Sequence, residues 1–140
     1  MNRIKNISAK LGTKNFVNIR LNTFKASDIP GNVLDTKYVC ADNNNDVTVS
    51  VTVMGNVISG DTFAEINGTT INLDQTNVIG NNPSIKGRKL IITKSVSGSA
   101  DEPCVVTVYI KGGYKNIPFH LTTKIGSSGT LDFLGTIEFI

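Results

Sequence analysis

The sequence predicts an all-β domain, an antiparallel sandwich of two sheets with about seven to nine short strands. Apolar and polar side chains alternate along several short segments, which is the period of a strand with one buried face. Gly, Asn and Pro separate these segments at intervals of roughly eight to twelve residues, as turns do in a sandwich or barrel. No segment has the spacing of a convincing amphipathic helix. Such patterns do not determine strand order, so Ig-like and jelly-roll arrangements both stay open.

The length and composition suit one domain. A chain of 140 residues buries about two-thirds of its unfolded surface on folding, without the help of a disulfide or metal. Charged residues make up 18% of the chain, less than the usual value of about a quarter. Asn, Thr and Ser take their place, and these residues favour turns and strands. We assign residues 15–140 to a single β-sandwich domain and residues 1–14 to a basic N-terminal arm.

The first half of the chain contains the clearest strand. Between residues 46 and 54, four valines alternate with Thr, Ser and Met, so the valines share one face. Residues 17–21 alternate in the same way and predict an earlier strand. A turn signal spans residues 26–32, and a short strand is predicted at residues 37–41.

The middle of the chain contains a hairpin signal. Asn67-Gly68 lies between two segments of strand character, residues 64–66 and 69–73. Asn-Gly predicts a tight hairpin turn here because both residues tolerate a positive φ. Residues 80–84 are rich in Gly, Asn and Pro and predict a loop.

The last strands fall into two types. Residues 90–93 and 104–110 are nearly continuous in apolar character, which predicts strands buried on both faces. Residues 117–125 and 130–140 alternate instead. A free apolar edge strand would be an aggregation hazard. We therefore expect the C-terminal strand to lie inside a sheet or to dock on a neighbouring subunit.

Side chains that carry catalysis or bind metals are scarce. His120 is the single histidine, and alternation places it opposite the apolar face of its strand. Cys40 and Cys104 are expected to be reduced, partly buried thiols, because the Trp and Tyr that accompany an Ig disulfide are missing. A zinc site needs about four suitably spaced ligands. We therefore predict a protein that is not an enzyme, with no catalytic residue, no metal site and no cofactor.

The charge is unevenly distributed. Residues 1–27 contain six basic residues and no acidic one, a charge of +6, whereas the rest of the chain carries −3. A basic N-terminal segment of this kind, which includes the arm at residues 1–14, suits contact with an acidic surface. The predicted partner-binding residues are the basic residues of the arm: Arg3, Lys5, Lys10 and Lys14. Ile4, Ile7 and Leu11 add a short apolar stripe that would lie in a partner's groove. Nucleic-acid binding stays open but is not favoured, because few aromatics lie near the arm for base stacking.

The chain resembles, in style, the small virion proteins of tailed phages. The likeness lies in the short sandwich, the basic arm, the Asn-rich turns and the terminal strand ending Gly135-Thr136-Ile137-Glu138-Phe139-Ile140. Capsid auxiliary or decoration proteins and head-fibre or tail accessory modules are of this kind, and crAss-like phages fit the composition.

The resemblance implies a non-enzymatic structural component of a particle. Such a protein would form homo-oligomers or be present in many copies, and would dock on the major capsid or tail protein through its arm and sheet edges. It would be made in the host cytoplasm and reside in the virion. The sequence predicts neither a signal peptide nor a membrane span, so we expect no membrane partner.

A carbohydrate-binding or adhesin module is the alternative function. Such sites need exposed aromatic side chains, and the chain contains no Trp. Tyr114, which follows Gly112-Gly113, is the predicted glycan-binding residue.

Overall fold

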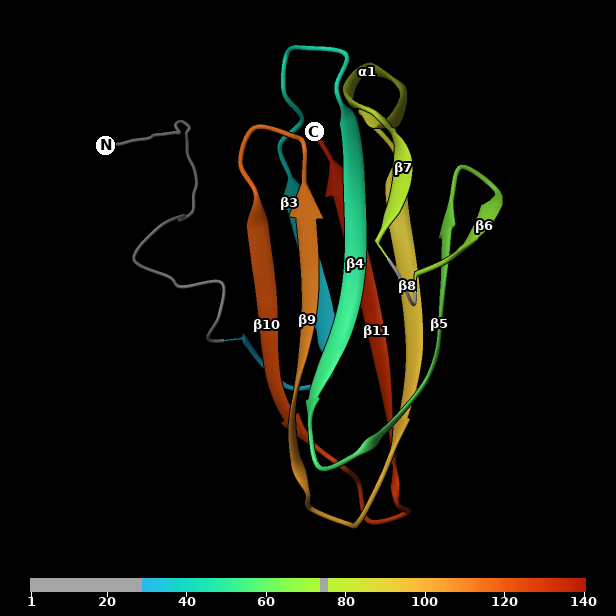
Figure 1. Cartoon of the computed structure of the whole chain (residues 1–140), viewed down its shortest axis with the longest axis vertical. Helices are drawn as coiled ribbons and strands as arrows, with labels where there is room; N and C mark the ends of the chain where they lie inside the picture. The colour runs from blue at the N-terminus through green and yellow to red at the C-terminus, as the bar shows by residue number, and fades with distance from the viewer. Residues whose placement is uncertain (1–28, 74–75) are drawn as a thin grey trace, which may run out of the picture.

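The computed structural model describes residues 29–73 and 76–140, and it confirms the predicted all-β sandwich (Figure 1). Sheet 1 has the strand order β2 (Ile29–Pro30), β10 (Ile117–Lys124), β9 (Pro103–Lys111), β4 (Asp46–Gly55) and β7 (Asn77–Asn81). Sheet 2 has the order β3 (Val33–Tyr38), β11 (Thr130–Phe139), β8 (Lys89–Ser97), β5 (Ile58–Ile66) and β6 (Thr69–Asn72). Nine strands in these two ranges have four or more residues, in line with the predicted number. The predicted arm and the strand predicted at residues 17–21 lie outside the described residues.

Most connections pass from one sheet to the other. Only the pairs β5–β6 and β9–β10 are consecutive strands within one sheet. All described pairings are antiparallel except β2 with β10 and β3 with β11, which are parallel. β2 and β3 are therefore one edge segment that changes sheets at Gly31-Asn32, where Gly31 has a φ of 95°.

Two of the sequence predictions are confirmed in detail. In β4, Val47, Val49 and Val51 point into the core and are at most 4% exposed. Asn67 and Gly68 form the turn between β5 and β6, with φ values of 53° and 77°. Both residues thus occupy the left-handed region that the Asn-Gly pair was expected to supply.

Two predicted elements differ from those observed. The short strand expected at residues 37–41 is β3, which begins at Val33 and ends at Tyr38. The strand starts directly after the sheet-changing turn, and its residues Leu34 and Tyr38 face the core. The loop expected at residues 80–84 contains the short helix α1 (Asn82–Ile85), whose N-cap Asn81 accepts a hydrogen bond from the backbone N–H of Ser84 at 3.0 Å.

The prediction that β8 and β9 are buried on both faces was wrong. In β8 the side chains of Leu90 and Ile92 are fully buried, whereas Ile91 between them is 43% exposed. Tyr109 on β9 also faces outward and is partly exposed. Each sheet packs on the other through one face, and within the described ranges no third layer covers the outer faces. Burial on one face is the usual state of an antiparallel sandwich strand.

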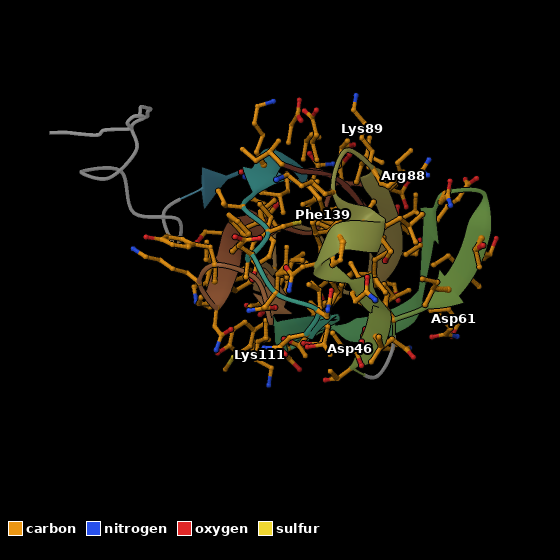
Figure 2. The ribbon with its side chains drawn as sticks, turned by 90° about the horizontal axis from the view of Figure 1, so that it is seen from above. Asp46, Asp61, Arg88, Lys89, Lys111 and Phe139 are labelled. Atoms are coloured by element: carbon orange, nitrogen blue, oxygen red, sulfur yellow. The ribbon has the colours of Figure 1, made fainter. Side chains whose placement is uncertain are left out.

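The core lies between the two sheets, and β11 contributes several of its largest buried side chains. Phe133, Ile137 and Phe139 are at most 1% exposed, and β11 pairs with β3 on one side and β8 on the other. The C-terminal strand is thus an inner strand, one of the two predicted positions. Figure 2, seen from above, shows Phe139 between the side that carries Lys111 and the side that carries Lys89.

Candidate functional site

The predicted partner-binding residues Arg3, Lys5, Lys10 and Lys14 lie outside the described residues. Tyr114 is described, and its side chain is 70% exposed in the loop between β9 and β10. The backbone N–H of Tyr114 donates to the carbonyl oxygen of Val39 at 3.0 Å. The hydroxyl of Tyr38 donates to the carbonyl of Lys115 at 2.5 Å and accepts from the N–H of Gly113 at 3.0 Å. Tyr114 is therefore presented on a loop that the core holds in place.

The loops beside α1 meet at Asn82, a polar residue that is only 1% exposed. Its side-chain oxygen accepts a hydrogen bond from the N–H of Ala41 at 2.8 Å. Its amide nitrogen lies 2.9 to 3.1 Å from the side-chain oxygen of Asn43 and the carbonyls of Asn45 and Gly112. No signal in the sequence predicts this role, because Asn82 lies among other asparagines in a predicted loop. One side chain of α1 thus links two loops at the same end of the sandwich, the β3–β4 loop and the β9–β10 loop.

A groove of about 710 Å³ lies against this linked loop end. Its wall is mostly polar, and it is lined by Cys40, Ala41, Asp42, Asn43, Asn44, Asn82, Pro83 and Lys86. Burial raises the pKa of the Cys40 thiol, an effect that the positive charge of Lys86 partly opposes. A thiol with a raised pKa is a weak nucleophile at neutral pH. The groove is therefore better suited to hydrogen bonding than to covalent chemistry.

The two cysteines are unpaired, as predicted. Cys40 is half-buried near the loop end, and Cys104 is buried in a second small cluster with Val96, Ile125 and Leu131. Burial raises the pKa of the Cys104 thiol, and the negative charge of Glu102 raises it further. Both thiols pack as small apolar groups.

The outer face of sheet 1 contains His120. Its Nδ1 lies 2.8 Å from the hydroxyl of Thr107 on the neighbouring strand. Thr52 is the partner of Thr107 on β4, so a row of hydroxyl-bearing residues crosses the sheet beside the imidazole. His120 is half-buried and faces away from the core, as the alternation predicted.

The outer face of sheet 2 carries a row of exposed apolar side chains. Val33, Leu134, Thr93 and Phe63 are register partners across β3, β11, β8 and β5. Ile91 lies two residues from Thr93 on the same face of β8. We call Val33, Leu134, Phe63 and Ile91 the apolar row; their exposed fractions lie between 42% and 53%.

Sequence reasoning missed the apolar row because of Lys94. Lys94 faces inward and is 5% exposed; its ammonium donates to the carbonyl of Gly60 at 2.8 Å and to the hydroxyl of Thr62 at 2.5 Å. A lysine at a core position interrupts the alternation of apolar and polar residues along β8. Residues 90–93 taken alone therefore predict a short strand buried on both faces. Thr93 and Ser95 are the signal that Ile91 belongs to an exposed face.

A shallow groove of about 530 Å³ follows the apolar row on sheet 2. Asp61 and Asp132 line it together with Phe63 and Leu134. The next register row contains Asp35 and Glu65, both exposed. The outer face of sheet 2 therefore combines apolar side chains with an acidic rim.

The sheet edges are short or interrupted. β6 and β7 have four and five residues, and Pro118 lies in the part of β10 that extends beyond its two register pairs with β2. Proline cannot donate to an added strand, and short edge strands are a second protection against unwanted pairing. The apolar row on the outer face is accordingly a more prominent surface than any described edge.

The fold and these surfaces define a two-sheet β-sandwich with a hydrogen-bonded loop end and an acidic, partly apolar outer face. Comparison with protein-family models, curated proteins and solved structures found no match to this chain. Among the described residues, no group of three or more His, Cys, Asp or Glu side chains is placed to hold a metal ion. Nor does that part of the chain contain a helix long and apolar enough to cross a membrane.

Proposed function

We propose that this chain is a non-enzymatic structural component of a phage or virus particle, an auxiliary or decoration protein that docks on the capsid or tail. The observation that carries the proposal is the apolar row on the outer face of sheet 2. Exposed apolar patches rimmed by polar groups are typical of protein–protein contacts. The basic N-terminal segment provides a further contact, and the edges of β6 and β7, which are four and five residues long, contribute only a minor one.

The proposal is tested on purified particles of the source virus. Mass spectrometry of a density-purified particle is expected to find the chain in a fixed ratio to the major capsid or tail protein. Particles assembled without it are expected to bind the added protein saturably. Absence of the chain from the particle, together with no binding to particles that lack it, would overturn the proposal.

A glycan-binding module is the second candidate, and Tyr114 is the observation that favours it. The ring is 70% exposed on a loop that hydrogen bonds hold in place. A glycan array should then show saturable binding that Tyr114→Ala abolishes and Tyr109→Ala, a matched loss of an aromatic ring on sheet 1, preserves. An array with no saturable binding would remove this candidate.

A further inference from the structure

The apolar row is one continuous surface that spans four strands of sheet 2. Adjacent strands lie about 4.8 Å apart, so partners in register along Val33, Leu134, Thr93 and Phe63 are nearest neighbours. Ile91 extends this surface toward the first residue of β8, Lys89. A partner covering the row would remove four large apolar side chains from water.

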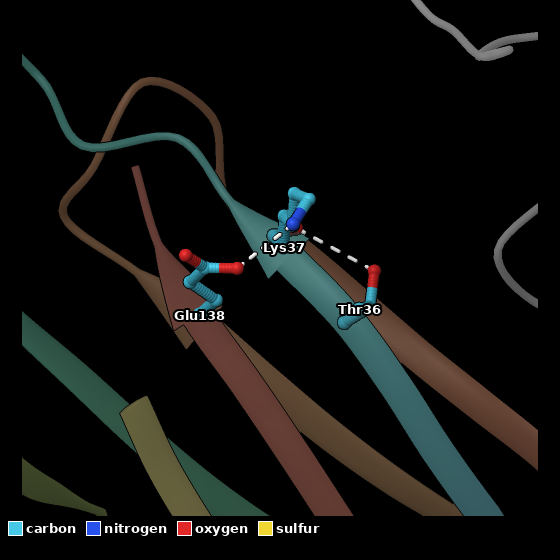
Figure 3. Close-up of polar contacts among 3 residues, drawn as sticks. All are labelled: Thr36, Lys37 and Glu138. Carbon is cyan, nitrogen blue, oxygen red and sulfur yellow. Dashed lines mark hydrogen bonds and ion pairs between the residues drawn. The ribbon is translucent and has the colours of Figure 1, made fainter. Parts of the chain in front are cut away.

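The charge around the row favours a basic partner. Asp61 and Asp132 line the groove. In the next register row Glu65 is the direct partner of Ile91, and Asp35 lies on the far side of Thr136. Lys37 and Lys89 are the described bases of this face and lie on either side of Glu138 in register, and the Lys37 ammonium pairs with the Glu138 carboxylate at 2.8 Å (Figure 3), so the face carries more acids than bases. Two copies placed with these faces together would oppose acids to acids, which is unfavourable.

The N-terminal segment of the chain has the matching chemistry. Residues 1–27 carry a charge of +6 with no acidic residue, and they contain the stripe of Ile4, Ile7 and Leu11. The 28 residues before Ile29 reach at most about 95 Å when extended. A ten-residue strand such as β4 is about 33 Å long. The segment is therefore long enough to reach a neighbouring molecule.

The position of β2 places the start of the described chain on sheet 1, whereas the apolar row of the same molecule lies on sheet 2. β10 and β11 are joined by a short connection between the two sheets and so run in opposite directions. Because β2 is parallel to β10 and β3 is parallel to β11, the chain reverses at Gly31-Asn32. The described chain thus begins in sheet 1 beside β10 (Figure 1), whereas the apolar row lies on β3, β11, β8 and β5 of sheet 2.

We propose that the outer face of sheet 2, with its apolar row and the acids Asp61 and Asp132, binds the N-terminal segment of a second copy of the chain. The inference rests on the proposed assembly function, since it names the first contact of that assembly. Reciprocal binding of the arms of two copies closes a two-fold dimer, whereas one-way binding is a head-to-tail contact that generates rings or open arrays.

The test measures self-association of the full chain by light scattering at low salt. The molar mass of the natural protein is expected to rise above the 15.0 kDa monomer with concentration and to return to it at high salt. A face variant, Asp61→Lys with Asp132→Lys, and an arm variant, Lys5→Glu with Lys10→Glu, are each expected to associate about tenfold more weakly or not at all. Mixed one to one, the two variants should associate again, because the natural arm of the face variant can bind the natural face of the arm variant.

A matched control carries the same charge change elsewhere. Asp42→Lys with Asp46→Lys alters the loop end and the first residue of β4, and should leave self-association unchanged. If a charge variant does not fold, as judged by circular dichroism, the exposed Leu134→Ser variant replaces it and must also lose association. A natural protein that stays monomeric at every concentration overturns the inference, as does a face variant that associates normally. Neither result bears on whether the chain is present in purified particles, so the two proposals fail separately.

Discussion

Gly112 shows how one residue determines the shape of the loop end. Its φ is 100°, and a Cβ atom at this position would lie 2.1 Å from the carbonyl oxygen of Asp46. A side chain is thus excluded twice, by the left-handed backbone and by a neighbouring backbone atom that cannot rotate away. The carbonyl of Gly112 also accepts a hydrogen bond from Asn82, so the same residue takes part in the loop network.

Replacing Gly112 with Ala should lower the free energy of unfolding by about 2–4 kcal/mol, from backbone strain plus the clash with Asp46. Gly87→Ala is the matched control, since Gly87 has a φ of 85° but nothing within 4 Å of the added Cβ. It should cost only about 1 kcal/mol. Urea denaturation measures both values. Equal losses would show that the close approach to Asp46 has no energetic weight.

Asn82→Ala should destabilise the protein by about 2–3 kcal/mol, because it leaves the partly buried N–H of Ala41 and the carbonyl of Gly112 without the side chain that bonds them. Asn44→Ala, in the same loop region but exposed, should change the free energy of unfolding by less than about 0.5 kcal/mol. Hydrogen exchange of the Ala41 amide gives an independent reading. Unchanged protection of that amide in Asn82→Ala would contradict the assigned hydrogen bond.

At the scale of the element, β8 shows that an apolar run need not be buried on both faces. Leu90, Ile92 and Val96 face the core, while Ile91 faces outward on the apolar row. The strand sits in the middle of sheet 2, between β11 and β5, yet only one of its faces has a sheet packed against it. The position of a strand in its sheet and the burial of its two faces are thus separate properties.

The two isoleucines of β8 provide a direct comparison. Ile92→Ala should lower the free energy of unfolding by about 2–5 kcal/mol, because it opens a cavity in the core. Ile91→Ala removes the same atoms from an exposed face and should cost less than about 1 kcal/mol. Thermal or urea unfolding of both variants checks this difference. A large loss for Ile91→Ala would mean that the outer face is covered within one molecule.

The pairing of β3 with β11 includes an ion pair that is sensitive to pH. The hydrogen bond and positive charge of Lys37 lower the pKa of the Glu138 carboxyl. A lowered folded pKa adds stability that is complete above the ordinary carboxyl pKa and is lost as the pH falls through the folded value. Both side chains are more than one-third exposed, so the contribution stays below about 1 kcal/mol.

Glu138→Gln should therefore be slightly less stable than the natural protein at neutral pH, and the difference should vanish in acid. Melting temperatures measured over an acid-to-neutral pH series, at low and high salt, test this expectation. Lys37→Gln should reproduce the loss. A difference that grows as the pH falls would have the wrong sign for the assigned ion pair.

At the scale of the whole molecule, a smaller cluster that contains Cys104 continues the core at the end of the sandwich opposite the loop end. Cys40 borders the main core near the loop end. The thiols therefore report on packing in two different places. Burial raises the pKa of both, and the partly exposed Cys40 is the more accessible.

Alkylation with iodoacetamide should be slow for both thiols in the folded protein, with Cys40 reacting before Cys104. The rates should rise with pH, because only the thiolate reacts and the raised pKa keeps its fraction small. In concentrated urea the two rates should become equal. Mass spectrometry after timed quenching separates the two sites, and a folded-state Cys104 that reacts as fast as in urea would contradict the buried cluster.

The sequence by itself determined the class of fold, the strand with alternating valines in β4 and the Asn67-Gly68 turn. For the last strand it left two positions, inside a sheet or docked on a neighbouring subunit. These features depend on local periodicity and turn chemistry, which are properties of neighbouring residues. Only the tertiary structure decided that the chain changes sheets between β2 and β3, that Asn82 links two loops and that Val33, Leu134, Phe63 and Ile91 form one surface. These features join residues up to about a hundred positions apart, and such contacts depend on strand order and register, which the alternation of side chains along a single strand does not encode.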